Sequence, residues 1–420
     1  MTLQTILNRL QKLHPKEIDL SLDRVKNLCK KLGNPQKDLK YISVVGTNGK
    51  YSTIQALRAI LKEANIKCNI YTSPHIQRIN ERFIFNDEEI SDSDLSDLLV
   101  KVEEVNNGEE ITYFEILTAA YFFHASKYRE NINIIESGLF HRFDATNIID
   151  KNILSIVTAI GLDHLDWLPK DEQTIEKIIF EKTSALLNSK IVIAKQSSEN
   201  TQKLIKQSLS SNEAKKVMFN DNFSYSINEN EFIYFEDEFG GIKLPQHLMG
   251  QFQIDNSATA VAAVRNLNLN ITDENIKSGI TKIKSIARLQ EIKSGKLKNL
   301  CKNNQLFVDG SHNPLGAKVL NDYLQTLKCK KHIILGMMAN KDHEEYISYF
   351  KDISSLTTID IPNQPNSIKG EDLKNKLNKF PNLNYEKSVE DALKKISTDK
   401  DDIILITGSL YLAGEVLNLN

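Results

Sequence analysis

The sequence is poor in cysteine and tryptophan and carries almost no net charge. Four cysteines and one tryptophan occur among 420 residues, and thiols spaced this widely form neither a disulfide scaffold nor a metal knuckle. Lysine and arginine number 53 against 55 aspartates and glutamates, so the chain as a whole gives no electrostatic basis for binding nucleic acid or an anionic membrane. We therefore expect reduced thiols and no nucleic-acid or membrane partner.

Long apolar runs are also missing. No stretch approaches the about 18 residues that a membrane-spanning helix needs, and residues 1–6 lack the basic start and apolar core of a secretion signal. These absences favour a cytoplasmic protein, which we expect to be a monomer. The chain has 40% hydrophobic and 26% charged residues, the balance of a folded protein, and its length suits two to three domains of roughly 150 residues each.

Short β-branched runs alternate with segments of helical period. Such runs occupy residues 41–45, 133–135, 153–157 and 191–194. After the first run, Ile54, Leu57 and Leu61 recur at spacings of three and four residues, as on the buried face of a helix. This alternation predicts parallel βα units.

The pattern changes between residues 217 and 245, where aromatic residues stand among Asn, Glu and Asp without helical period. This segment predicts a small antiparallel β insert, and a helical stretch follows at 253–267. A second series of apolar runs lies at 306–308, 332–335, 358–361 and 403–406. We predict an α/β fold in which residues 1–286 form a P-loop-type, mostly parallel sheet domain with the insert, and residues 287–420 form a smaller, Rossmann-like α/β domain.

The sharpest local feature is the run Gly46-Thr47-Asn48-Gly49-Lys50-Tyr51-Ser52-Thr53 between a predicted strand and a predicted helix. Glycines let the backbone wrap around a phosphate, the N–H groups at the helix start face it, and Lys50 adds a positive charge. The common form of this motif has glycine where Val44 stands and a hydroxyl where Tyr51 stands. A phosphate loop and a plain surface turn before a helix are the two interpretations of this segment.

Polar side chains also follow the predicted strands. Glu136 ends one apolar run, and Asp163 and His164 follow the next. Open parallel sheets bind their ligands at the carboxyl ends of the strands, and a carboxylate there can hold Mg²⁺ against phosphates. Asp309 and His312 take the equivalent place in the second domain. The structural alternatives are a buried histidine with satisfied hydrogen bonds and a helix-capping loop.

Eight segments, in one order and over nearly the whole chain, resemble the folylpolyglutamate synthase and dihydrofolate synthase family, ATP-dependent amide ligases related to the Mur peptidoglycan ligases. The segments are residues 46–52, 72–75, 80–82, 144–147, 161–168, 181–182, 309–314 and 408–411. The resemblance implies that L-glutamate is joined to dihydropteroate or to folate through an acyl phosphate, with ATP and Mg²⁺, in a cleft to which the second domain contributes.

The resemblance also implies roles for matching residues. The residues that would bind ATP are Thr47, Asn48, Gly49, Lys50, Ser52, Asn256, Arg288 and Asp309. Those that would bind magnesium are Ser73, Glu136 and His164. The pterin substrate would lie against Asp19, Leu20, Ser21, Thr112, Tyr113, Phe114, Glu115, Phe143, Asp144 and Ala145. Lys50, Lys182 and His312 would take part in catalysis, and Lys182 corresponds to a lysine that is carbamylated in this family.

Three residues depart from the family pattern. Tyr51 stands where the family has glycine, and Phe140 and His141 replace two further glycines. They motivate one alternative, a nucleotide-binding regulatory protein that has lost ligase activity. The other alternative is a Mur-type peptide ligase. A dehydrogenase is disfavoured because no Gly-x-Gly-x-x-Gly follows a predicted strand.

Overall fold

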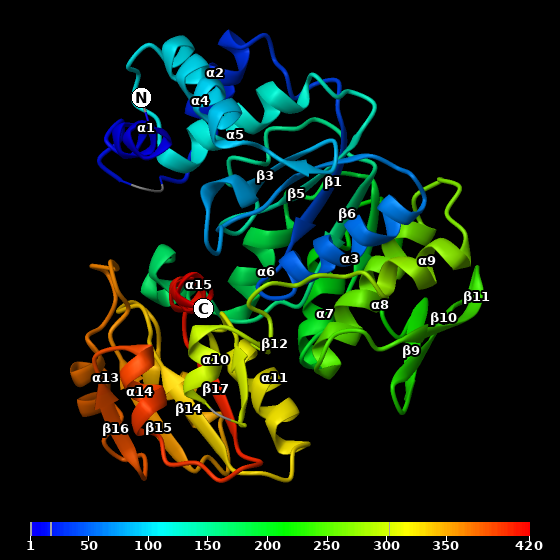
Figure 1. Cartoon of the computed structure of the whole chain (residues 1–420). Coiled ribbons are helices and arrows are strands. Elements are labelled where there is room, and N and C mark those ends of the chain that lie inside the picture. Colours follow the sequence, from blue (N-terminus) through cyan, green and yellow to red (C-terminus); the bar gives the residue numbers. More distant parts are fainter. Residues whose placement is uncertain (1, 17–18, 302) are drawn as a thin grey trace. The chain divides into compact units, whose positions relative to one another are not determined.

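The computed structural model describes residues 2–16, 19–301 and 303–420 and divides into two compact units (Figure 1). Unit 1 comprises Met1–Ile160, Lys170–His247 and Ile254–Lys284. Unit 2 comprises Gly161–Pro169, Leu248–Gln253 and Ser285–Asn420. Two short segments from the earlier part of the sequence therefore pack with the C-terminal unit.

Unit 1 is built on an eight-stranded sheet with strand order β4-β3-β2-β5-β1-β6-β7-β8. Strands β2, β5, β1, β6, β7 and β8 run parallel to one another. Strands β3 and β4 extend the sheet beyond β2, and each pairs antiparallel with its neighbour. The central strands β2, β5 and β6 are buried along their length. The apolar runs at 133–135 and 153–157 predicted β5 and β6, whereas β2 was not predicted. The strands are β1 (Lys40–Val45), β2 (Cys68–Tyr71), β3 (Phe83–Phe85), β4 (Glu88–Glu89), β5 (Ile132–Glu136), β6 (Leu154–Val157), β7 (Lys190–Ile193) and β8 (Lys216–Met218).

Helices connect these strands and bury apolar faces. Helix α3 follows β1 and buries Ile54, Leu57 and Leu61, the face that their spacing predicted. Helices α1, α2, α4 and α5 pack on one another around an apolar cluster of unit 1. The helices that begin in this part of the chain are α1 (Leu3–Leu10), α2 (Asp23–Lys31), α3 (Lys50–Glu63), α4 (Asp92–Asn106), α5 (Tyr113–Ala125), α6 (Ile175–Thr183), α7 (Glu199–Ser208), α8 (Gln251–Arg265) and α9 (Asp273–Ile280), with the short 3₁₀ turns η1 (Ile79–Arg82), η2 (Leu165–Trp167) and η3 (Lys170–Glu172).

The predicted β insert is confirmed as a separate three-stranded antiparallel sheet (Figure 1). It consists of β9 (Phe223–Asn228), β10 (Glu231–Glu236) and β11 (Gly240–Pro245). The start of the predicted insert was wrong, because residues 216–218 form β8 and pair with β7 of the main sheet. The predicted helix at 253–267 is α8.

Unit 2 holds a six-stranded sheet with strand order β12-β13-β17-β14-β15-β16, parallel except for β12. The predicted α/β fold class is confirmed. The sequence prediction placed β15 three residues too late and omitted β16, whose residues are mostly polar. The strands are β12 (Gln290–Glu291), β13 (Gln305–Val308), β14 (Lys331–Leu335), β15 (Ser355–Ile359), β16 (Leu383–Glu386) and β17 (Ile403–Thr407); the helices are α10 (Lys296–Leu300), α11 (Pro314–Gln325), α12 (His343–Ser348), α13 (Gly370–Lys376), α14 (Val389–Lys395) and α15 (Leu410–Leu419).

Two expectations from composition can be compared with the structure. Within the described residues, no helix is both long and apolar enough to cross a membrane. Cys29, Cys68, Cys301 and Cys329 are free thiols, and the first three are buried. Burial raises the pKa of Cys29 to about 12, so this thiol is a packing group and not a nucleophile.

Candidate functional site

The predicted phosphate loop lies between β1 and α3, in the strand, loop and helix order that anion binding requires. Gly49 precedes α3 with φ +86°, a left-handed conformation that favours glycine. A Cβ atom on Gly49 would lie 2.4 Å from Oδ1 of Asn256, and one on Gly46 would lie 2.0 Å from Oγ1 of Thr158. Both glycines are therefore required by close packing, and α8 brings Asn256 against the loop.

Two loop amides are engaged by the protein itself. The N–H groups of Thr47 and Asn48 donate to the carbonyl oxygen of Ala159, at 2.9 and 3.1 Å. These bonds anchor the loop to the segment after β6. The residues that follow lie at the positive end of the α3 dipole, where an anion is favoured. Tyr51 and Ser52 lie in that first helical turn.

Two ammonium groups converge on the loop. Nζ of Lys50 lies 3.2 Å from the Gly46 carbonyl oxygen and 3.7 Å from Oε1 of Glu136. Nζ of the buried Lys182, in α6, donates to the same Gly46 carbonyl at 2.9 Å and lies 5.6 Å from the centre of the Phe140 ring. Residues that are 132 positions apart in the sequence thus concentrate positive charge at one loop.

A buried carboxylate lies beside these cations. Glu136 ends β5, where it pairs in register with Val44 of β1, and is 4% exposed. Its Oε2 accepts the Ser73 N–H at 3.1 Å, so two of the three predicted magnesium ligands meet in unit 1. Carboxylate and hydroxyl oxygens suit Mg²⁺. Among the described residues, no group of three or more His, Cys, Asp or Glu gathers as a complete metal cage.

The loop that carries Ser73 is held by its own polar contacts. The Glu81 carboxylate accepts the backbone N–H groups of residues 76–78. Arg82 donates to Nδ1 of His75 at 3.0 Å and to Oγ of Ser73 at 3.4 Å. Burial, together with Arg82, lowers the pKa of His75 to about 4, so its ring is neutral near pH 7. These contacts fix the conformation of the loop that carries Ser73.

Asp144 organises a second loop, residues 137–147. One carboxylate oxygen accepts the N–H groups of Gly138 and Leu139, at 2.9 and 2.8 Å. The other accepts the N–H and hydroxyl of Thr146. Burial raises the pKa of Asp144, although these hydrogen bonds oppose that rise. All four acceptor positions of the carboxylate therefore face groups of its own loop.

Phe140 and His141, which replace two glycines of the family pattern, are both accommodated in the 137–147 loop. Phe140 has φ +56°, the left-handed conformation in which glycine is favoured and which costs other residues about 1–2 kcal/mol. His141 is buried, with Nδ1 2.9 Å from Oγ of Ser137, and burial with Lys182 lowers its pKa to about 4. The backbone keeps a glycine-type conformation at residue 140, and the ring there covers Lys182.

The residues predicted to bind pterin form two groups in unit 1. Arg24, which the sequence analysis missed, donates to Asp19 at 3.0 Å and to both oxygens of Glu115. Thr112 and Glu115 form a capping box at the start of α5, which also carries Tyr113. Leu20 and Ser21 follow Asp19. This network joins two predicted segments that are 91 residues apart.

The second group lies at the 137–147 loop. The Phe114 ring would be 2.9 Å from a Cβ atom on Gly138, and it stacks on Tyr71 with ring centres 6.0 Å apart. Phe143 is 39% exposed, with the Arg142 guanidinium 4.5 Å from its ring centre. Ala145 is buried beside Asp144. Unit 1 therefore presents an exposed aromatic ring next to the loop that Asp144 holds.

In unit 2, Asp163 is the centre of a polar cluster. Its carboxylate accepts from Lys341 Nζ at 2.7 Å and from Asn313 Nδ2 at 2.9 Å, and it lies 3.6 Å from Nε2 of His312. The backbone N–H of His164 donates to it at 2.9 Å. Burial alone would raise the pKa of Asp163, but His312, His164 and Lys341 lower it well below its usual value. Asp163 thus positions the predicted catalytic residue His312.

Asp309 holds the neighbouring segments of unit 2. Its oxygens accept the N–H groups of Leu289 and Ser311, each at 2.7 Å. Burial raises its pKa while Arg288 opposes the rise, and Arg288 donates to the Ala287 carbonyl at 3.0 Å. Asn313 caps α11, with Pro314 at its first residue, as the motif predicted. The structure brings Arg288, Asp309 and His312 to the carboxyl end of β13.

We expect Asp163→Asn to destabilise unit 2 by about 3 kcal/mol near pH 7, because it leaves the Lys341 ammonium without its partly buried counter-charge. A carboxyl whose pKa is lowered by folding stabilises the protein above its unfolded pKa, near 3.8, and this stabilisation disappears as the pH falls through the folded pKa. Denaturant unfolding at pH 7 and at pH 3 measures both effects. Exposed Asp166 in the same segment provides the control Asp166→Asn, which should change little; equal effects of both variants would contradict the central role of Asp163.

Comparisons with known proteins match most of the chain. The Mur ligase middle domain model matches residues 44–264, and the model "Mur ligase, glutamate ligase domain" matches residues 295–410. The chain is 31% identical to the Haemophilus influenzae dihydrofolate synthase/folylpolyglutamate synthase, covering 97% of this chain and 95% of that protein.

Solved structures share the whole fold. Escherichia coli FolC in complex with DHPP and ADP has a TM-score of 0.86 at 27% identity, covering 100% of this chain and 97% of that one. The bifunctional folylpolyglutamate synthase/dihydrofolate synthase of Yersinia pestis, complexed with AMPPNP and Mn ion, has a TM-score of 0.86 at 25% identity, with 100% and 98% covered.

Proposed function

We propose, since this chain belongs to the dihydrofolate synthase/folylpolyglutamate synthase family of Mur ligases, that it uses ATP to join L-glutamate to dihydropteroate, to folate, or to both. The observation that carries the proposal is the convergence of Lys50, Lys182 and Glu136 on the loop at residues 46–49. Such an arrangement can neutralise the charge of a transferring phosphoryl group and hold its metal.

The chemistry explains why a phosphate loop serves amide formation. A carboxylate is a poor electrophile, because its charge repels a nucleophile and its oxygen is a poor leaving group. Transfer of the γ-phosphoryl group of ATP to the pteroate carboxylate gives an acyl phosphate. The amino group of glutamate then attacks the carbonyl carbon, and phosphate leaves. Lys50 would hold the phosphates during the first step, and Asn256 would fix the loop against α8.

A divalent cation fits the oxygens of Glu136 and Ser73 beside Lys50. We propose Mg²⁺ as the natural ion; when bound, it would neutralise phosphate charge. The family resemblance implies His164 as a further ligand. Lys182 contributes either as an ammonium or, as the family resemblance implies, as a carbamate. The carbamate N–H could keep the hydrogen bond to Gly46 while its carboxylate offered another metal ligand. Arg288 and Asp309 would bind the nucleotide, as the family resemblance implies.

The pteroate substrate would use the exposed Phe143 ring and the region around Phe114. Stacking of aromatic rings adds about 0.5–1.5 kcal/mol beyond the area buried. Asp19 and Glu115, joined through Arg24, would shape the remaining wall. His312, positioned by Asp163, would act on the glutamate or phosphate side of the reaction.

The decisive experiment is an ADP-release assay with dihydropteroate and tetrahydrofolate supplied separately, each with and without glutamate. A ligase releases ADP only when both the pterin acid and glutamate are present. Turnover with one pterin or with both tells which reactions the enzyme performs. A protein that binds ATP but shows no glutamate-dependent release would instead be the regulatory relative suggested by Tyr51, Phe140 and His141.

We expect Glu136→Gln to raise the magnesium concentration for half-maximal activity by about tenfold or more, because an amide is a weaker ligand than a carboxylate for this hard cation. The amide oxygen can still accept the Ser73 N–H, so the loop should keep its conformation. Initial rates measured against magnesium concentration give the result. Glu130→Gln, at a side chain that is 93% exposed, is the matched control, and an unchanged magnesium requirement in Glu136→Gln would remove Glu136 from the metal site.

A further inference from the structure

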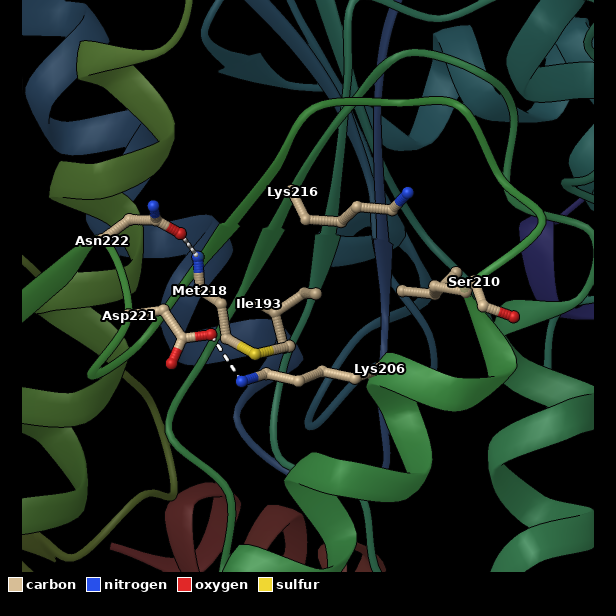
Figure 2. A pocket seen from close by; sticks show the side chains of 8 residues that line it. Ile193, Lys206, Ser210, Lys216, Met218, Asp221 and Asn222 are labelled. Carbon is tan, nitrogen blue, oxygen red and sulfur yellow. Dashed lines mark hydrogen bonds and ion pairs between the residues drawn. The ribbon is translucent and has the colours of Figure 1, made fainter.

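Two cavities lie apart from the residues discussed so far. The cavity between α7 and β8 in unit 1 holds about 180 Å³ (Figure 2). Its polar groups already bond within the protein, since Lys206 pairs with Asp221 at 2.6 Å and Asn222 accepts the Met218 N–H at 2.9 Å (Figure 2). The second cavity, in unit 2, holds about 610 Å³, within the range of small-molecule sites.

The larger cavity lies at the opposite edge of its sheet from Asp309 and His312. Those residues follow the carboxyl end of β13, whereas the cavity is lined by residues near the amino ends of the parallel strands β14, β15 and β16. Hydroxyl, amide and charged side chains dominate its wall. They include Lys330, His332, Ser355, Thr357, Asn384 and Lys395.

A serine, a histidine and an aspartate form a hydrogen-bonded chain at this wall. His332 and Ser355 are register partners on β14 and β15, with Nδ1 of the ring 2.8 Å from Oγ of the serine. Nε2 of His332 lies 3.2 Å from Oδ2 of Asp402. His332 and Asp402 are each 4% exposed, whereas Ser355 is half-buried and borders the cavity. Ser355 and His332 both line the cavity, and the buried Asp402 lies behind the histidine.

The proton positions follow from the partners. Burial alone would raise the pKa of Asp402, but the Asp399 N–H and His332 lower it below its usual value. An ionised Asp402 accepts the proton on Nε2, which leaves the lone pair on Nδ1 to accept the Ser355 hydroxyl. This is the order of nucleophile, base and carboxylate found in serine hydrolases. In those enzymes Nε2 faces the serine and Nδ1 the carboxylate, whereas here Nδ1 faces Ser355 and Nε2 faces Asp402.

We propose that Ser355, His332 and Asp402 form a second active site, which hydrolyses small polar carboxylic esters in the cavity of unit 2. Oγ of Ser355 attacks the ester carbonyl carbon while its proton passes to Nδ1 of His332, and the alcohol leaves with that proton. Water, deprotonated by His332, then attacks the acyl-serine and releases the acid, which restores the hydroxyl. Thr357, two residues along β15, and its register partner Asn384 supply hydrogen-bond donors in the cavity wall.

The test combines labelling with turnover on the full chain. A fluorophosphonate probe should label one serine with loss of fluoride, and peptide mass analysis should place the label on Ser355. Hydrolysis of p-nitrophenyl acetate should fall by at least about 100-fold in Ser355→Ala. Ser348→Ala, at an exposed position on α12 outside the cavity, should retain both labelling and hydrolysis. Asp402→Asn should keep the serine but label much more slowly.

The folded state is checked independently, because Ser355 is not part of the phosphate-loop site. Ser355→Ala should keep its melting temperature and any glutamate-dependent ADP release. Labelling of a different serine, or p-nitrophenyl acetate hydrolysis that is unchanged in Ser355→Ala, would overturn the proposal. Neither result would bear on the ligase function proposed above, which rests on unit 1 and the Asp163 cluster.

Discussion

Lys50→Ala should abolish glutamate-dependent ADP release, with a fall in kcat/KM of about 10³-fold or more, while the chain stays folded. The ammonium lies against the Gly46 and Thr47 carbonyl oxygens, where it can follow the charge of the transferring phosphoryl group. Removing one such pre-positioned positive group from a phosphoryl-transfer site costs about two to three orders of magnitude, and the charge repulsion between phosphate and nearby Glu136 would add to this.

A matched control lies on the same helix. Lys62 is in the last turn of α3 and is exposed, so Lys62→Ala should retain normal turnover. Circular dichroism and thermal unfolding of both variants show whether the fold is kept. Lys50→Arg is informative as well, because it keeps the charge but changes the shape of the donor. Near-normal turnover in Lys50→Ala would remove the phosphate-loop assignment.

Local pattern predicted the phosphate loop because every element of it is contiguous in the sequence. Strand, glycine-containing turn and helix follow one another within residues 40–63, and the positive φ angles of Gly46 and Gly49 belong to the turn itself. The engagement of the Thr47 and Asn48 amides by Ala159 was not predictable, since it depends on how β6 pairs beside β1.

The sequence pattern did not predict which charged residues pair when they lie far apart in the chain. Arg24 is an ordinary basic residue on an amphipathic helix, and nothing in its neighbours indicates that it bridges Asp19 and Glu115. The same holds for Lys341, which neutralises Asp163 from 178 residues away. In both cases the sequence showed the carboxylates, and only the fold showed which cations they pair with.

The failure to predict strand β16 has a physical cause. Residues 383–386 form the edge strand β16 with the sequence Leu-Asn-Tyr-Glu, and its side chains are mostly half-exposed. Side chains that stay in contact with water need not be apolar, and none of these four is fully buried. The polar cavity of unit 2 borders this strand, since Asn384 and Glu386 are among its lining residues.

The last prediction concerns Asp144 and separates two roles. The family resemblance implies that Asp144 binds the pterin, in which case its loss should impair the use of dihydropteroate and leave ATP affinity unchanged. The hydrogen bonds imply a different outcome. In Asp144→Asn one carboxylate oxygen becomes an NH₂ group, which cannot accept the two N–H or O–H donors that it faces, and two buried donors lose their partner.

The expected result is therefore a combined loss. Unfolding free energy should fall by about 2–4 kcal/mol, since each unsatisfied buried donor costs about 1–3 kcal/mol. Because the same loop places Phe140 over Lys182 and Gly138 against Phe114, both ATP affinity and the apparent KM for dihydropteroate should worsen. The exposed Asp150 just beyond the loop gives the control Asp150→Asn, which should leave all three quantities unchanged. Normal stability and ATP affinity, with only dihydropteroate use impaired, would instead identify Asp144 as a direct pterin ligand whose loop contacts rearrange when the substrate binds.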